Sequence, residues 1–133
     1  MSLKEKVQHY VATVKSDFES SLALLAEDVV WINLLPGHVP FGGTYEGREG
    51  VVRYFMQMAD TFEIGEYQWD QFEYYEDGST LVMVGFEKDG KAVPTGKVFD
   101  LHFVWVIKFN DDGQIYYLRE HNDTAAIGDA FRS

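Results

Sequence analysis

The stretch that decides the fold is residues 96–124, which read GKVFDLHFVWVIKFNDDGQIYYLREHNDT. It predicts a long apolar strand over Val98–Phe109, a turn at Asp111-Asp112-Gly113 and a returning strand over residues 114–122. The returning strand ends in a run of ionisable and amide side chains at residues 119–123. A plain turn would be rich in Gly, Pro or Ser, so this polar ending indicates a functional role.

Alternate residues of a strand share one face, so Arg119, His121 and Asp123 are expected to point the same way. If that face looks into the fold, an imidazole and a carboxylate lie at the mouth of an aromatic cavity, where they can serve acid–base chemistry. Asp123 is the first catalytic candidate, and burial beside Trp105 would make it a usable base. The alternative is that Asp123 caps the segment that follows it. For His121 the alternative is a hydrogen-bonded structural histidine.

The composition fits one folded domain over residues 1–133. Hydrophobic residues make up 46% of the chain and aromatic residues 16%. That aromatic share suits either a thick core or an aromatic-lined pocket.

Charge and cysteine content exclude several classes of function. The net charge of −11 disfavours nucleic acid and anionic membrane surfaces as partners. The absence of cysteine excludes disulfides and thiolate chemistry. Neither paired metal-ligand spacing nor a phosphate-binding loop is present, so we expect no metal and no cofactor. The apolar runs are too short to span a bilayer and residues 1–6 do not resemble a signal peptide, which favours a cytoplasmic protein.

The order of the predicted elements is typical of an α+β fold. Helical spacing covers residues 3–13, Ser16-Asp17 can cap a second helix, and residues 47–50 begin a third. The third helix is expected to bury Val51, Phe55, Met58, Ala59 and Phe62. Strands dominate after that, with a bulge near Gln71, a hairpin turn over residues 76–79, a strand over residues 80–88 and a turn at Asp89-Gly90.

Both faces of the strand Val98–Phe109 are largely apolar. Leu101, Phe103, Trp105 and Ile107 alternate with His102, Val104, Val106 and Lys108. Antiparallel sheets usually leave one face polar, so something must cover the second face. A partner subunit is the simplest cover, which predicts a homodimer through the sheet; the alternative cover is the C-terminal segment, residues 124–133.

Several short motifs resemble one known family when they are taken in order. They are AEDVVW at residues 26–31, YEGREGV at residues 45–51, PTGK at residues 94–97, DGQI at residues 112–115 and REHND at residues 119–123. The chain resembles the SnoaL-like branch of the nuclear-transport-factor-two-like superfamily, which also holds ketosteroid isomerases and epoxide hydrolases. The resemblance implies a cone-like barrel, in which a curved antiparallel sheet packs on the N-terminal helices and encloses a deep pocket.

The resemblance also implies where functional residues lie. The isomerase pattern places its general-base Asp where this chain has Asn33, and the Arg-x-Asp pair of the epoxide hydrolases is missing from residues 84–88. Trp31 and Asn33 match the positions at which the epoxide hydrolases have a Tyr and an Asn. Asp123 matches their basic Asp, and SnoaL-like cyclases likewise use an Asp near the chain end.

These observations favour a small, largely apolar molecule as the ligand. We expect it to contact Trp31, Phe55, Phe103, Trp105 and Tyr10, while Asp123, His121 and Asn33 carry the chemistry. The reaction would be cofactor-free acid–base catalysis of the isomerase, cyclase, dehydratase or hydrolase type. The alternative is a non-catalytic ligand-binding or scaffold protein of the same fold, which the missing isomerase base favours.

Overall fold

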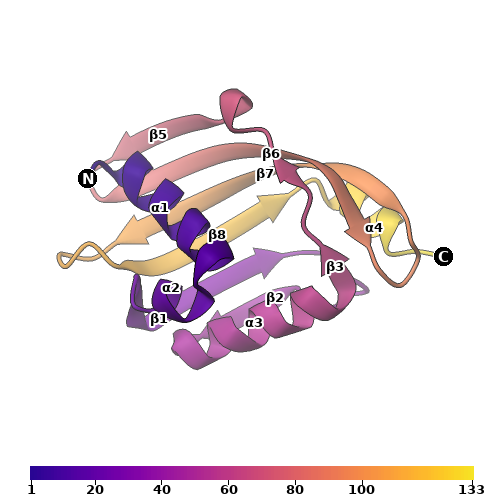
Figure 1. Ribbon diagram of the computed structural model, residues 1–133, viewed down its shortest axis with the longest axis horizontal. Helices are drawn as coiled ribbons and strands as arrows, with labels where there is room; N and C mark the ends of the chain where they lie inside the picture. The colour runs from indigo at the N-terminus through magenta and orange to yellow at the C-terminus, as the bar shows by residue number, and fades with distance from the viewer.

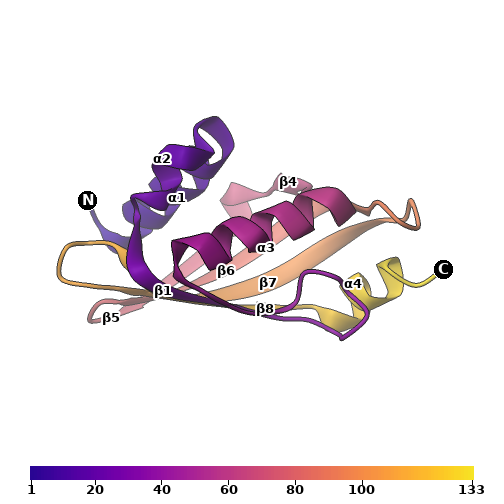
Figure 2. The same cartoon turned by 90° about the horizontal axis from the view of Figure 1, so that it is seen from below.

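The computed structural model describes residues 1–133 and places the long helices on one face of a curved sheet (Figures 1 and 2). The helices are α1 (Leu3–Ser16), α2 (Phe18–Leu22), α3 (Gly47–Thr61) and α4 (Thr124–Ala130), with a 3-10 turn, η1 (Trp69–Gln71). The strands are β1 (Leu25–Leu34), β2 (Gly43–Glu46), β3 (Phe62–Glu63), β4 (Glu66–Tyr67), β5 (Glu73–Asp77), β6 (Thr80–Ala92), β7 (Val98–Phe109) and β8 (Ile115–Asn122). No helix is both long and apolar enough to cross a membrane.

The sheet runs in the order β2-β1-β8-β7-β6-β3, and β4 and β5 also pair with β6. Its pairs are antiparallel except for β1 and β8, which run parallel. The expected α+β class, with a curved sheet packed on N-terminal helices, is therefore confirmed. The sheet is antiparallel apart from this one pair, in which the first strand lies alongside the last one after the chain has passed through α3 and strands β2 to β7.

The two long helices each bury one face against the sheet, and the sequence also explains where α1 begins. Ser2 and Glu5 form a capping box at the start of α1, which buries Val7, Tyr10 and Val11. In α3 the buried residues are Gly50, Val51, Tyr54 and Met58. Tyr54 replaces the predicted Ala59 on this stripe, because the stripe follows i, i+3 and i+7 spacing from Val51. Phe62 is buried as predicted, but it lies in β3, after the end of α3.

Strand β6 continues past its predicted end. Asp89-Gly90 is not a hairpin turn, since pairing with β7 resumes at Gly90 after a register shift that follows Glu87. Asp89 absorbs this irregularity with a φ of 61°. The chain reverses instead around Gly96, whose φ is 75° and whose N–H bonds the carbonyl of Ala92. The bulge predicted near Gln71 is the short turn η1 between β4 and β5.

The convex face of the sheet has no helical cover (Figure 2). Val84, Val104 and Val106 lie on it half-buried, and the rings of Phe86 and His102 stack there at 4.3 Å. The C-terminal helix packs on the other side, because Ile127 of α4 lines the interior cavity. The alternative cover considered for this face, residues 124–133, therefore does not lie over it.

Candidate functional site

A cavity lies between the concave face of the sheet and helices α1 and α3. The volume that the centre of a water molecule can reach inside this cavity is about 80 Å³. One water needs roughly 10–15 Å³ on the same measure. Apolar side chains dominate its walls: Val11, Val14, Phe41, Phe55, Met58, Phe62, Ile64, Leu101, Phe103 and Ile127. The exposed members of the lining, Lys15 and Ile64, mark its mouth. The cavity can therefore take up a small organic molecule.

Aromatic rings form much of the wall around Trp31. Its ring centroid lies 6.1 Å from that of Tyr10, 5.5 Å from Phe55 and 6.3 Å from Trp105, while Phe103 packs on Trp105 at 5.7 Å. All five residues predicted to contact a ligand therefore line one cavity. Their placement agrees with the sequence analysis, and their contact with a ligand stays a prediction.

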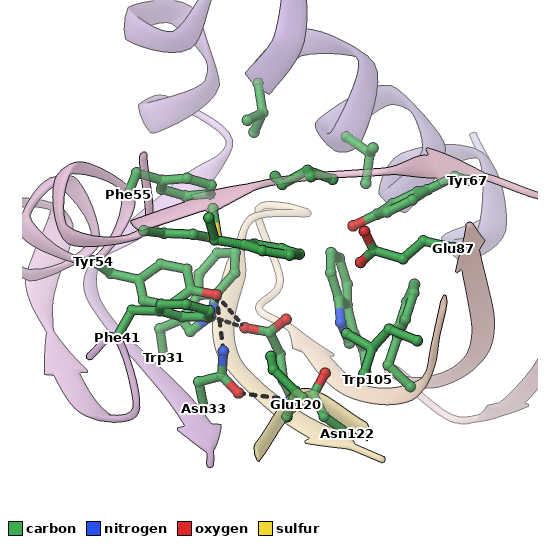
Figure 3. A pocket seen from close by; sticks show the side chains of 18 of the residues that line it. Trp31, Asn33, Phe41, Tyr54, Phe55, Tyr67, Glu87, Trp105, Glu120 and Asn122 are labelled. Carbon is green, nitrogen blue, oxygen red and sulfur yellow. Dashed lines mark hydrogen bonds between the residues drawn. The ribbon is translucent and has the colours of Figure 1, made fainter. Parts of the chain in front are cut away.

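The main polar group on this wall is Glu120 of β8 (Figure 3). Only 6% of the surface of Glu120 is exposed to solvent. The indole N–H of Trp31 and the hydroxyl of Tyr54 both donate to Glu120 Oε2, each at 2.8 Å. Oε1 accepts no hydrogen bond of normal geometry, although Trp105 lies beside it (Figure 3). One carboxylate oxygen is thus fixed and the other is open to a ligand.

Burial changes the acidity of this carboxyl group. Loss of solvent raises the pKa of Glu120 to about 7, because a carboxylate loses its hydration in an apolar wall. The hydrogen bonds from Trp31 and Tyr54 oppose this shift by favouring the ionised form, and the nearby Trp105 indole acts in the same direction. The resulting pKa of about 7 lets the group exist in both protonation states near neutral pH.

Two amides hold Tyr54 in place. Asn33 donates from Nδ2 to the Tyr54 hydroxyl at 3.0 Å, and Asn122 donates from Nδ2 to Asn33 Oδ1 at 2.8 Å. The chain Asn122, Asn33, Tyr54 therefore ends on Glu120 (Figure 3). Asn33 belongs to the cavity as predicted. Its hydrogen bond orients the Tyr54 hydroxyl, which donates to the Glu120 carboxylate.

Two tyrosine hydroxyls in the cavity have no protein partner. The Tyr10 hydroxyl is the one fully buried side-chain polar atom in the chain without a hydrogen bond. Tyr67, from β4, lines the same cavity and makes no side-chain hydrogen bond. Desolvation and the nearby Glu120 raise the pKa of Tyr10, and desolvation with Glu87 does the same for Tyr67. Both phenols therefore stay neutral and can donate to a ligand oxygen.

A second buried carboxyl group, Glu87 of β6, lines the cavity from another strand. It is 3% exposed, and the backbone N–H of Gly65 donates to its Oε2 at 2.7 Å. Burial raises the pKa of Glu87 to about 7; the Gly65 bond opposes the rise, and the charge of Glu120 adds to it. The site thus holds two carboxyl groups.

The predicted facing of β8 is wrong. The inward residues near its end are Leu118, Glu120 and Asn122, whereas His121 and Asp123 are exposed and neither lines the cavity. His121 accepts a hydrogen bond from Arg119 Nε at 2.8 Å on the outside. Asp123 caps α4, since its Oδ1 accepts from the N–H of Ala126 at 3.1 Å. The capping alternative therefore describes Asp123 correctly.

The sequence analysis did not single out Glu120, Glu87 or Tyr54. The pairing of β7 with β8 sets Trp105 opposite Glu120, and directly opposed residues share a face. The apolar face of β7 predicts that Trp105 points inward, so the register between β7 and β8 is the signal that identifies Glu120 as an inward residue. Glu87 continues the buried alternation Leu81, Met83, Gly85 along β6, and this pattern is visible in the sequence.

The described chain gathers no group of three or more His, Cys, Asp or Glu side chains that could hold a metal ion. The polar groups of the cavity are instead carboxyl, phenol, indole and amide groups. Together these groups can exchange protons with a ligand and hydrogen-bond a ligand oxygen.

Residues 7–118 match the SnoaL-like domain family. The chain is similar to an NTF2-like protein from Burkholderia xenovorans LB400, at 27% identity and a TM-score of 0.84, over 98% of this chain and 95% of that one. It is also similar to an NTF2-like protein of unknown function from Burkholderia pseudomallei, at 26% identity and a TM-score of 0.78 over the full length of both. TerC, co-crystallised with polyporic acid, shares the fold at 21% identity, with a TM-score of 0.79 over the full length of both. No curated protein matches the chain.

Proposed function

The chain belongs to the SnoaL-like domain family, and from this premise we propose that it binds a small, largely apolar molecule and moves a proton on it with Glu120 as the acid–base group. The observation that carries the proposal is the state of this carboxyl group. It is buried in the cavity wall, anchored through Oε2 by Trp31 and Tyr54, and open at Oε1. A buried carboxylate with a free oxygen is well suited to take a proton from a bound ligand.

The proposed role of Glu120 replaces the one first considered for Asp123 and His121. Those two side chains lie outside the cavity, so they cannot reach a ligand held there. Asn33 keeps an indirect role, because it holds the Tyr54 hydroxyl that donates to Glu120. Asn33 is therefore a positioning residue in this proposal.

The unpaired tyrosines indicate what the ligand offers in return. A buried hydroxyl without a partner is costly, and a ligand oxygen beside Tyr10 would remove that cost. Neutral phenols at Tyr10 and Tyr67 can stabilise negative charge that develops on such an oxygen when Glu120 removes a nearby proton. The proposed substrate is therefore a small, largely apolar molecule with an oxygen atom close to the reacting carbon, and isomerisation, cyclisation, dehydration and hydrolysis all fit this arrangement.

The test is a turnover assay on a panel of small enones, epoxides and β-hydroxy ketones, with the parent protein and Glu120→Gln. The amide keeps the shape and the acceptor for Trp31 but cannot cycle a proton. We expect turnover by the parent and its loss in the variant, while binding measured by tryptophan fluorescence persists. If the parent binds panel compounds and turns none over, a non-catalytic ligand-binding protein is the better description.

We also propose a homodimer formed through the convex face of the sheet. The half-buried Val84, Val104 and Val106 form an apolar patch there that no part of the chain covers. A second copy with the same patch gives a symmetric contact. Light scattering should give twice the monomer mass at micromolar concentration, and Val104→Glu should shift it towards the monomer by burying an unpaired charge. A monomer mass for the parent protein would contradict the proposal.

A further inference from the structure

Two carboxyl groups, on two different strands, reach into the cavity (Figure 3). Glu120 comes from β8 and Glu87 from β6, and β7 lies between these strands in the sheet. Both residues are buried, at 6% and 3% exposure. Carboxylates are rarely buried unless they are paired, and here neither has an ion-pair partner, since the one salt bridge in the chain joins Arg132 and Asp129.

The two groups are held in the same manner. Each uses Oε2 as the anchored oxygen, Glu120 with Trp31 and Tyr54, and Glu87 with the backbone N–H of Gly65. Each leaves Oε1 without a hydrogen bond of normal geometry. Neither Oε1 is sealed from the cavity, since only the Tyr10 hydroxyl is a fully buried polar side-chain atom without a partner.

The anchor of Glu87 depends on local backbone geometry. Gly65 lies so close to β6 that a Cβ on it would come within 2.0 Å of the Lys88 carbonyl oxygen. This approach brings the Gly65 N–H to 2.7 Å from Glu87 Oε2. Just after Glu87, the register shift of β6 at Asp89 redirects the strand. The local backbone geometry therefore holds the Glu87 carboxyl group in a defined position.

We propose that Glu87 is a second catalytic group of this cavity, so that a proton removed from the substrate by one carboxylate is replaced at a different substrate atom by the other carboxylic acid. This inference rests on the proposed function of Glu120 and extends it. Glu120 takes a proton from a C–H bond, the electron pair of that bond forms a new double bond, and the electron pair of the substrate's existing double bond moves to the second atom. Glu87 gives its proton to the second atom, which completes the shift. Proton exchange with water through the mouth beside Lys15 then restores both groups, and no other reactant is consumed.

The surroundings of Glu87 favour a state in which one carboxyl group is ionised and the other is protonated. The charge of Glu120 raises the pKa of Glu87, after the larger effect of burial, so ionisation of one group favours the acid form of the other. The charged and titratable groups close enough to act on Glu87 or to be affected by it are Tyr67 and Glu120 in the cavity and Lys15 at its mouth; Lys15 lowers the pKa of Glu87. A site with one carboxylate and one carboxylic acid holds a base and an acid together.

The test compares Glu87→Gln with Glu120→Gln and with the exposed control Glu66→Gln on β4. The glutamine at position 87 keeps an acceptor for Gly65, so the fold is retained while proton transfer is lost. For a panel compound that the parent turns over, both cavity variants should lose on the order of a hundredfold or more in kcat, and the control should match the parent. In deuterium oxide the parent should place solvent deuterium at the atom that gains the proton.

A carbon-13 titration of the glutamate carboxyl groups gives a readout that needs no substrate. Glu120→Gln should lower the midpoint of the Glu87 carboxyl signal, because a neighbouring negative charge is gone; an unmoved midpoint overturns the proposal. Parent-like turnover in Glu87→Gln, with turnover lost in Glu120→Gln, overturns the role of Glu87 and leaves the proposed function standing. A parent that turns over no panel compound contradicts both.

Discussion

Glu120 and Asp123 lie three residues apart at the end of one strand, and the fold gives them opposite environments. Glu120 is buried in the cavity wall and accepts hydrogen bonds from Trp31 and Tyr54. Asp123 is exposed and caps α4 through the N–H of Ala126. The two carboxyl groups have similar chemistry, but Glu120 is the candidate catalytic group and Asp123 has a structural role. The difference arises because Glu120 lies on the inward face of β8, whereas Asp123 follows the end of that strand and begins α4.

The largest expected effect is on turnover. Glu120→Gln should reduce kcat by on the order of a hundred- to ten-thousand-fold, because the amide cannot exchange a proton. Asp123→Asn should leave kcat close to that of the parent, since Asn also caps helices well. Steady-state rates of the two variants on the same compound measure this contrast. Equal loss in both variants would break the comparison.

The next effect is on the pH dependence of stability. The folded pKa of Glu120 is raised from 4.5 to about 7, so between these values the unfolded chain releases a proton that the folded chain keeps. Stability should therefore fall as pH rises from about 4.5 to about 7, and the cost should then be fully present above that range. At 1.36 kcal/mol per pKa unit the loss is about 3 kcal/mol. Glu87 adds to it with the same sign.

Urea unfolding at a series of pH values measures this dependence. In Glu120→Gln the decrease should be smaller, and the variant should be at least as stable as the parent above neutral pH, because no charge is buried. The exposed Glu66→Gln variant controls for the general effect of removing one negative charge from an acidic chain. A variant that is less stable than the parent at every pH would indicate a structural role for the Glu120 carboxylate.

A smaller effect is expected for the outer residues. Asp123→Ala should destabilise the protein by about 1 kcal/mol, the usual cost of losing a helix cap, without changing the pH profile of turnover. His121→Ala removes only an exposed hydrogen bond with Arg119 and should change stability by less than about 0.5 kcal/mol. Thermal melting at fixed pH measures both. A large loss of turnover in His121→Ala would contradict this account and indicate that His121 takes part in the reaction.

Much of the architecture could be predicted from sequence because periodicity and turn residues report it directly. The strand Val98–Phe109 and the first helix follow from such patterns. The cavity lining followed too, since Trp31, Phe103 and Trp105 lie on strongly apolar faces. The parallel pairing of β1 with β8 is not local, and no pattern within either strand shows it.

The chemistry of the site was harder to predict, because it depends on strand register. Polar residues on a half-buried strand can occupy either face, and a shift of one position exchanges His121 for Glu120. Asp123 also had a competing use as a cap for α4, a helix that the sequence analysis did not expect. Tyr54 matters through its bond to Glu120, which joins residues 66 positions apart. Such contacts follow from the fold and not from any motif.

The central claim is that Glu120 is a buried acid–base group, and a carbon-13 NMR titration of its carboxyl carbon tests this most directly. The signal is assigned by its absence in Glu120→Gln. The account predicts a midpoint about where burial places the pKa of Glu120, near 7. A midpoint for Glu120 at the ordinary value of 4.5 would contradict the account.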